Sequence, residues 1–60
     1  MEVNTSYSIE KIKQLGFFEE SANREKTKVF IKGDKVYFFE AIDSENLRLY
    51  SIINKKSFFL

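Results

Sequence analysis

Apolar and polar residues alternate on both sides of Gly33–Asp34, a pattern typical of a β-hairpin. A two-residue loop that begins with glycine favours a tight turn between two antiparallel strands, here residues 28–32 and 35–39. The polar run 43–46 carries a second turn signal, and the apolar-rich stretch 47–53 follows it. These patterns predict a three-stranded antiparallel meander.

Pairing across the two turns sorts the side chains of this meander into two faces. The first turn pairs Phe30 with Tyr37, and we expect the second to pair Ile42 with Leu47. One face then carries the residues expected to form the core: Val29, Ile31, Val36, Phe38, Ile42, Leu47, Leu49 and Ile53. The other face is aromatic and basic, with Lys28, Phe30, Lys32, Lys35, Tyr37, Phe39, Arg48, Tyr50 and Ile52.

A short helix is predicted from Ser8 to Leu15. Ser8 is a favoured N-cap residue, and Gly16 stands where a left-handed residue ends a helix. Phe17 then falls where it packs back on Ile12. Two turns of helix are not stable alone in water, so we expect this helix to lie on the sheet.

The fold class predicted is α+β, with one short N-terminal helix packed on a three- or four-stranded antiparallel β-meander. The segment Phe17–Lys26 decides the number of strands, since it reads as a loop, as an extension of the helix, or as a strand that turns at 22–25 and pairs Glu19 with Lys28. We favour the strand. The chain closes with Phe58-Phe59-Leu60, and we expect this tail to dock on its own chain or on a neighbouring one.

The chain has 60 residues, so it forms a single small domain spanning residues 1–60. A domain of this size buries only about 60% of the surface of its unfolded chain, which leaves its stability marginal. Cysteine and histidine are both absent, so no disulfide and no thiolate or imidazole metal site reinforces it. We therefore expect good packing or self-association to stabilise the fold.

The sequence carries no membrane or export signal that we recognise. No apolar run approaches the roughly 20 residues that cross a bilayer, and the first residues lack the pattern of a signal peptide. We expect a soluble, cytoplasmic protein. The formal net charge is +1, which gives no overall attraction to phosphate backbones.

Catalysis has little basis in this sequence. Histidine, the usual general base, and cysteine, the strongest nucleophile, are both absent. The two glycines form no phosphate-binding loop. We expect neither an enzyme nor a cofactor or metal site. Glu40 falls on the expected core face, so we place it near the sheet edge, in contact with solvent or a lysine.

The aromatic and basic face has no element of its own chain to cover it, because the helix covers one side only. Three occupants fit it: a second copy of the chain, a different protein gripped by aromatic anchors, or a single-stranded nucleic acid. We expect a protein partner, with nucleic acid as the alternative. The residues expected to bind are Lys28, Phe30, Lys32, Lys35, Tyr37, Phe39, Arg48 and Tyr50.

The function expected is that of a small non-catalytic inhibitor. Free-standing chains of this size, rich in lysine, isoleucine, phenylalanine and asparagine and without proline, are typical of phage or mobile-element products. Such proteins block a host factor or a defence complex by covering its surface. No motif in the chain identifies a family.

Overall fold

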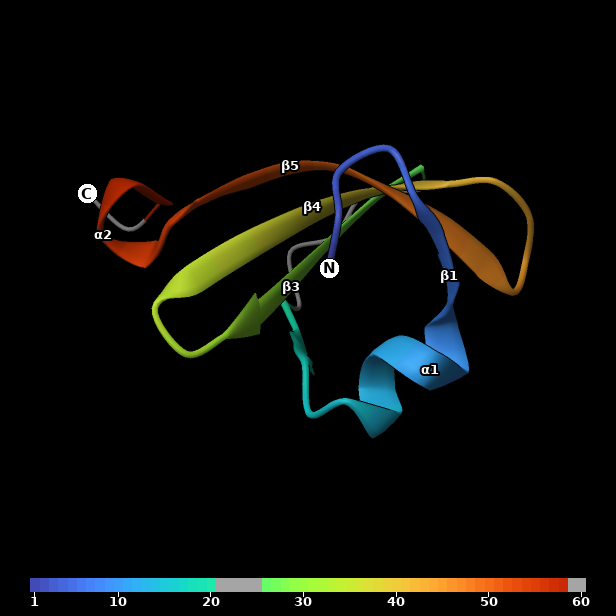
Figure 1. The fold of residues 1–60 in the computed structure, drawn as a ribbon, viewed down its shortest axis with the longest axis horizontal. Coiled ribbons are helices and arrows are strands. Elements are labelled where there is room, and N and C mark those ends of the chain that lie inside the picture. The colour runs from blue at the N-terminus through green and yellow to red at the C-terminus, as the bar shows by residue number, and fades with distance from the viewer. Residues whose placement is uncertain (21–25, 59–60) are drawn as a thin grey trace.

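The computed structural model of the chain describes residues 1–20 and 26–58. A short N-terminal helix packs against a five-stranded antiparallel sheet that curls strongly into a half-barrel (Figure 1). The predicted α+β class is confirmed, with five strands instead of three or four. The elements are β1 (Ser6–Ser8), α1 (Ile9–Gln14), β2 (Phe18–Glu19), β3 (Thr27–Lys32), β4 (Lys35–Ala41), β5 (Asn46–Asn54) and α2 (Lys55–Phe58), and the strand order is β1-β5-β4-β3-β2.

Helix α1 begins and ends as its sequence predicts. The Ser8 hydroxyl accepts a hydrogen bond of 3.0 Å from the Lys11 N–H, which satisfies one of the free donors of the first turn. Gly16 has a φ of 88°, and the Phe17 N–H donates to the Ile12 carbonyl at 3.4 Å. This is the Schellman ending, in which a left-handed residue turns the chain back on the helix.

Strands β3 and β4 form the predicted hairpin, and Phe30 pairs with Tyr37. The segment after α1 joins this hairpin as β2, so residues 18–19 are a strand, but their register differs from the prediction. Glu19 lies opposite Phe30 rather than opposite Lys28. The helix ending explains the shift, because it places Phe17 in the core and the chain enters the sheet directly afterwards. The turn predicted at 22–25 lies outside the described residues.

A β-bulge at Tyr50 interrupts the pairing of β4 with β5. Phe38 lies opposite Ser51, whereas the next residue, Phe39, lies opposite Leu49. Tyr50 is therefore the additional residue on β5, and the register before it differs by one residue from the register after it. The prediction that Ile42 pairs with Leu47 is wrong, because Leu47 pairs with Ala41.

This shift reverses the predicted sides of the sheet. A slip of one residue turns each side chain to the opposite face, so Leu47 and Leu49 join the aromatic side instead of the aliphatic one. Helix α1 covers that aromatic side, which is the concave side of the half-barrel (Figure 1). The core there consists of Ile12, Phe17, Phe30, Phe39, Leu47 and Leu49.

The sequence did not predict β1, which pairs with the first half of β5 and places Tyr7 opposite Leu47. The pairing ends at Asn4, whose N–H donates to the Leu49 carbonyl at 2.6 Å. Asn4 has a φ of 68°, a left-handed conformation that asparagine tolerates better than most residues. Beyond the turn at Asn4, the Glu2 N–H donates to the Tyr7 hydroxyl at 2.9 Å.

The described end of the chain docks on the sheet. Residues 55–58 form the single turn of α2, and the ring of Phe58 lies 5.8 Å from the ring of Phe38, edge to face. The expectation that the tail docks on its own chain is confirmed for Phe58, while Phe59 and Leu60 lie outside the described residues. Neither helix in the described part of the chain has the length and apolar character of a membrane span.

Candidate functional site

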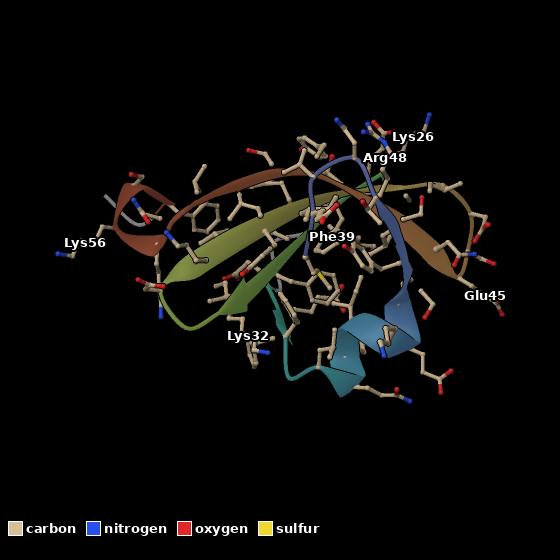
Figure 2. All side chains as sticks on the ribbon, viewed as in Figure 1. Lys26, Lys32, Phe39, Glu45, Arg48 and Lys56 are labelled. Atoms are coloured by element: carbon tan, nitrogen blue, oxygen red, sulfur yellow. The ribbon has the colours of Figure 1, made fainter. Side chains whose placement is uncertain are left out.

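Two of the aromatic rings expected to bind a partner lie inside the protein. Phe30 is 1% exposed and Phe39 is 0% exposed, and both pack in the core under α1. Figure 2 shows Phe39 near the centre of the molecule. The prediction that these rings belong to an uncovered face is wrong, because the bulge at Tyr50 brings Leu47 and Leu49 to the same side and α1 covers the combined set.

Tyr37 and Lys32 also help to close the concave side. The Tyr37 ring meets the Phe17 ring edge to face, with centroids 4.8 Å apart. Lys32 Nζ lies 5.1 Å from the centroid of the Phe17 ring and donates a hydrogen bond of 2.7 Å to the carbonyl of Leu15. An ammonium group over an aromatic face is favourable, so Lys32 stabilises the contact between the end of α1 and β3.

Lys28 and Lys35 each have a polar neighbour on the chain itself. Lys28 Nζ lies 4.0 Å from the Glu19 carboxylate, which Lys13 also approaches to 3.7 Å. Lys35 Nζ donates a hydrogen bond of 2.7 Å to the side-chain oxygen of Asn54. Contacts of this kind at the surface are weak and screened by salt, so both ammonium groups can exchange these neighbours for others.

Arg48 lies on the convex side of the sheet, opposite the predicted binding residues of β3 and β4. The shift at the bulge brings it beside Glu40, with Arg48 Nη2 3.4 Å from a Glu40 oxygen, while Nη1 donates to the side-chain oxygen of Asn4 at 2.8 Å. Glu40 is exposed, as expected for a carboxylate near solvent, but its partner is an arginine and not a lysine. The pair ties the N-terminal segment to β4 and β5.

The convex side of the sheet, which we call the outer face, carries an apolar row that crosses four strands. Phe18 pairs with Ile31, Ile31 with Val36, and Val36 with Ile53, so one residue from each of β2 to β5 lies in this row. Because side chains alternate along a strand, all four point away from α1. The neighbouring residues on the same face are Val29 and Phe38.

Part of this outer face is exposed. Phe18 is 71% exposed, the largest fraction among the large apolar side chains in the described chain, and Tyr50 is 40% exposed. The Tyr50 ring lies 6.3 Å from the Phe38 ring, which also meets Phe58. Tyr50 is the one ring of the predicted set that the structure leaves at the surface, and the bulge places it on the outer face.

An open hollow of about 660 Å³ adjoins Tyr50. Apolar and charged side chains both line it, so it differs from the apolar row beside it: Lys26, Thr27, Glu40, Ala41, Ile42, Asp43 and Tyr50. The Asp43 carboxylate caps the turn at its edge, because Oδ1 accepts hydrogen bonds of 2.8 Å from the N–H groups of Glu45 and Asn46. These bonds lower the pKa of Asp43 below its usual value.

Lysine side chains gather at one end of the molecule. The hairpin tip and α2 bring lysines to one end, where Lys56 lies in Figure 2, and Glu45 lies at the other end. Among the described residues, the end with the hairpin tip holds Lys32, Lys35, Lys55 and Lys56, and Asp34 of the hairpin turn lies beside them. The apolar row of the outer face lies next to this basic end, since Lys32–Lys35 is the pair adjacent to Ile31–Val36.

The exposed anchor on the outer face, Phe18, was not predicted to bind. The signal that could have found it is the doublet Phe17–Phe18, since strand alternation places only one of two adjacent rings in a core. The structure therefore places the exposed rings of Phe18 and Tyr50 on either side of a more buried apolar row, in which Val36 is 0% exposed. No protein-family model matches the chain, and no curated protein or solved structure matches it either.

Proposed function

We propose that this chain is a non-catalytic binding protein that docks the outer face of its sheet on a partner protein. The observation that carries the proposal is the exposure of Phe18, 71%, at the end of an apolar row that spans four strands. A buried aromatic ring removes about 150–250 Å² of surface from water, so covering Phe18 and Tyr50 gives a large hydrophobic gain. Aromatic anchors of this kind dominate the energy of protein interfaces.

The border of the outer face indicates the chemistry of the partner. Lys55 and Lys56 stand there in α2, whose Phe58 ring meets Phe38 of the outer face, and this favours acidic side chains on the facing surface. The partner we infer therefore presents an apolar depression for Phe18 with carboxylates beside it. The lysines orient the complex and speed its formation, while the rings supply most of the affinity.

The mode of action we infer is occlusion. The chain has no histidine or cysteine, and its described residues form a curved sheet with a short helix on the concave side, so covering a surface is the action that it supports best. This matches the size and composition of small phage or mobile-element inhibitors of host factors and defence complexes. The buried positions of Phe30 and Phe39 remove two of the rings on which bases could stack.

Capture of the partner from the organism that encodes the chain tests this proposal. We expect one protein to be retained in stoichiometric amount by the natural chain and lost with Phe18→Asp. Leu15→Asp is the matched control, because Leu15 is also an exposed apolar residue, at 41%, but lies at the end of α1 away from the outer face. Circular dichroism checks that both variants fold.

Two results would overturn the proposal. Equal retention by the natural chain and Phe18→Asp would show that the outer face is not the docking surface. Binding of a labelled single-stranded oligonucleotide that weakens steeply between 50 and 200 mM salt, at roughly the slope expected for released counterions, would identify a nucleic acid as the ligand.

A further inference from the structure

The second half of β5 forms an open edge of the sheet. β1 pairs with Asn46–Arg48 and its last bonds reach Leu49, where Asn4 turns the chain aside. In residues 1–20 and 26–58, no strand lies beside 50–54 on the side away from β4. Figure 1 shows β1 crossing only one end of β5, the end away from α2.

The backbone at this edge points outward at two positions. The Lys55 N–H donates to the Asp34 carbonyl at 2.8 Å, so residue 55 is directed toward β4. Backbone groups alternate along an antiparallel strand, which directs Ile53 and Ser51 to β4 in the same way. The N–H and C=O groups of Ile52 and the N–H of Asn54 are then directed to the open side, while the carbonyl of Asn54 lies at the start of α2.

This edge lacks the features that usually prevent strands from associating. Proteins protect exposed edges with charged residues, proline or very short strands. The other two edges are short, since β1 has three residues and β2 has two. The open part of β5, in contrast, reads Tyr50-Ser51-Ile52-Ile53-Asn54, which contains no charge and no proline.

We propose that a second copy of this chain pairs with the open edge of β5, antiparallel to it and related by a two-fold axis at Ile52. In this register Ile52 lies opposite its own counterpart, Ser51 opposite Ile53, and Tyr50 opposite Asn54. The five open residues of one copy thus match the five of the other, and no like charges face each other. The two half-barrels form one continuous sheet.

Charge favours the antiparallel arrangement over a parallel one. Lys55 and Lys56 follow the open edge directly, so parallel strands would place these lysines side by side. In the antiparallel pair each Lys55 stands three residues from the axis, which separates the two by about 20 Å at roughly 3.3 Å per residue. That distance exceeds the Debye length at physiological salt, about 8 Å, so their repulsion is screened.

This association is independent of the proposed docking surface. It uses the edge of β5, whereas docking uses the outer face, with Phe18 on β2 at the other side of the sheet. A dimer places two outer faces in one sheet and so presents two docking surfaces. The edge pairing adds backbone hydrogen bonds at Ile52 and Asn54, which a chain of marginal size can use for stability.

Sedimentation equilibrium across micromolar to millimolar concentrations tests the pairing. We expect the mass to approach twice the 7.1 kDa of the chain. Asn54→Pro removes an outward N–H that β4 does not use, so it should raise the dissociation constant at least about tenfold, through two lost hydrogen bonds per dimer. Asn54→Ala is the matched control, because it removes the side-chain bond to Lys35 and keeps the N–H.

A single introduced cysteine locates the axis even where the proline variant unfolds. The chain has no cysteine, so Ile52→Cys gives one thiol per copy, directly opposite its counterpart. Cα atoms of hydrogen-bonded antiparallel pairs are about 5.5 Å apart, a separation that a disulfide spans. Under mild oxidation Ile52→Cys should form a covalent dimer much faster than Leu15→Cys, whose position on α1 lies away from the edge.

Three results would overturn the edge pairing. The first is a monomer mass at millimolar concentration, and the second is equal cross-linking of Ile52→Cys and Leu15→Cys. The third is a dimer that dissociates with Phe18→Asp and persists with Asn54→Pro, which would show that the copies meet through their outer faces. Equal capture of the partner by the natural chain and Phe18→Asp, with the dimer unchanged, would leave the edge pairing intact and overturn only the docking proposal.

Discussion

Phe30 and Phe39 meet edge to face across β3 and β4, with ring centroids 5.4 Å apart and an angle of 88° between their planes. Such pairs stabilise a core by about 0.5–1.5 kcal/mol beyond the area that they bury. Together with Ile12 they connect the hairpin to α1. Because Phe39 also lies opposite Leu49, the same contact depends on the register that the bulge sets.

We expect Phe39→Ala to destabilise the protein far more than Phe38→Ala. Phe39 is fully buried, and truncation of a buried phenylalanine costs about 3–5 kcal/mol, which is enough to unfold a domain of marginal stability. Phe38 is half-buried on the outer face and leaves a partly open site. Urea unfolding of the two variants measures the difference, and a greater loss for Phe38→Ala would contradict the assignment of the faces.

Replacement of the N-cap residue Ser8 should destabilise α1 only where the new side chain lacks a hydrogen-bond acceptor. Ser8→Ala removes the oxygen that accepts the Lys11 N–H, so we expect a loss of about 1 kcal/mol in the free energy of unfolding. Ser8→Asp keeps an acceptor at the same position and serves as the control. If the two variants lose the same stability, the hydroxyl contributes nothing through this bond.

The hairpin turn depends on the left-handed conformation of Gly33. Its φ is 61°, and a Cβ built there would meet no atom within 4 Å, so the effect of a side chain is purely conformational. We expect Gly33→Ala to cost about 1–2 kcal/mol. A synthetic chain with D-alanine at the same position fits this φ and should be more stable than the natural one. Thermal unfolding of both chains decides the point.

The turn that Asp43 caps should lose stability in acid. Hydrogen bonds from the backbone of Glu45, and then from Asn46, lower the pKa of the Asp43 carboxyl in the folded state. Its contribution is therefore present above the unfolded value, near 3.8, and is lost as the pH falls through the lower folded value. Asp43→Asn keeps an acceptor oxygen but has no carboxyl to titrate. We expect its thermal unfolding temperature to fall less than that of the natural chain between pH 5 and 2.

The carboxyl carbon of Asp43, followed by NMR over the same range, gives the folded pKa directly. A value at or above the unfolded one would contradict the role of this side chain as a turn cap. Comparison of the natural chain with Asp43→Asn then separates this carboxyl from the others in the chain.

The sequence by itself determined the features that depend on a few neighbouring residues. Ser8 and Gly16 define the ends of α1, and Gly33 defines the hairpin that pairs Phe30 with Tyr37. Each is governed by the φ of one residue or by a hydrogen bond over three or four positions. The α+β class follows from these signals, because so short a helix requires a sheet to pack on.

The tertiary structure decided which side of the sheet became the core, and with it the candidate site. One additional residue, Tyr50, turns Leu47 and Leu49 toward the aromatic side. Whether a strand takes such a bulge depends on the total apolar volume that α1, β3, β4 and β5 bury together, and no local pattern reports that sum. The rings expected at the surface are buried for this reason, while Phe18, next to the buried Phe17, is left exposed on the outer face.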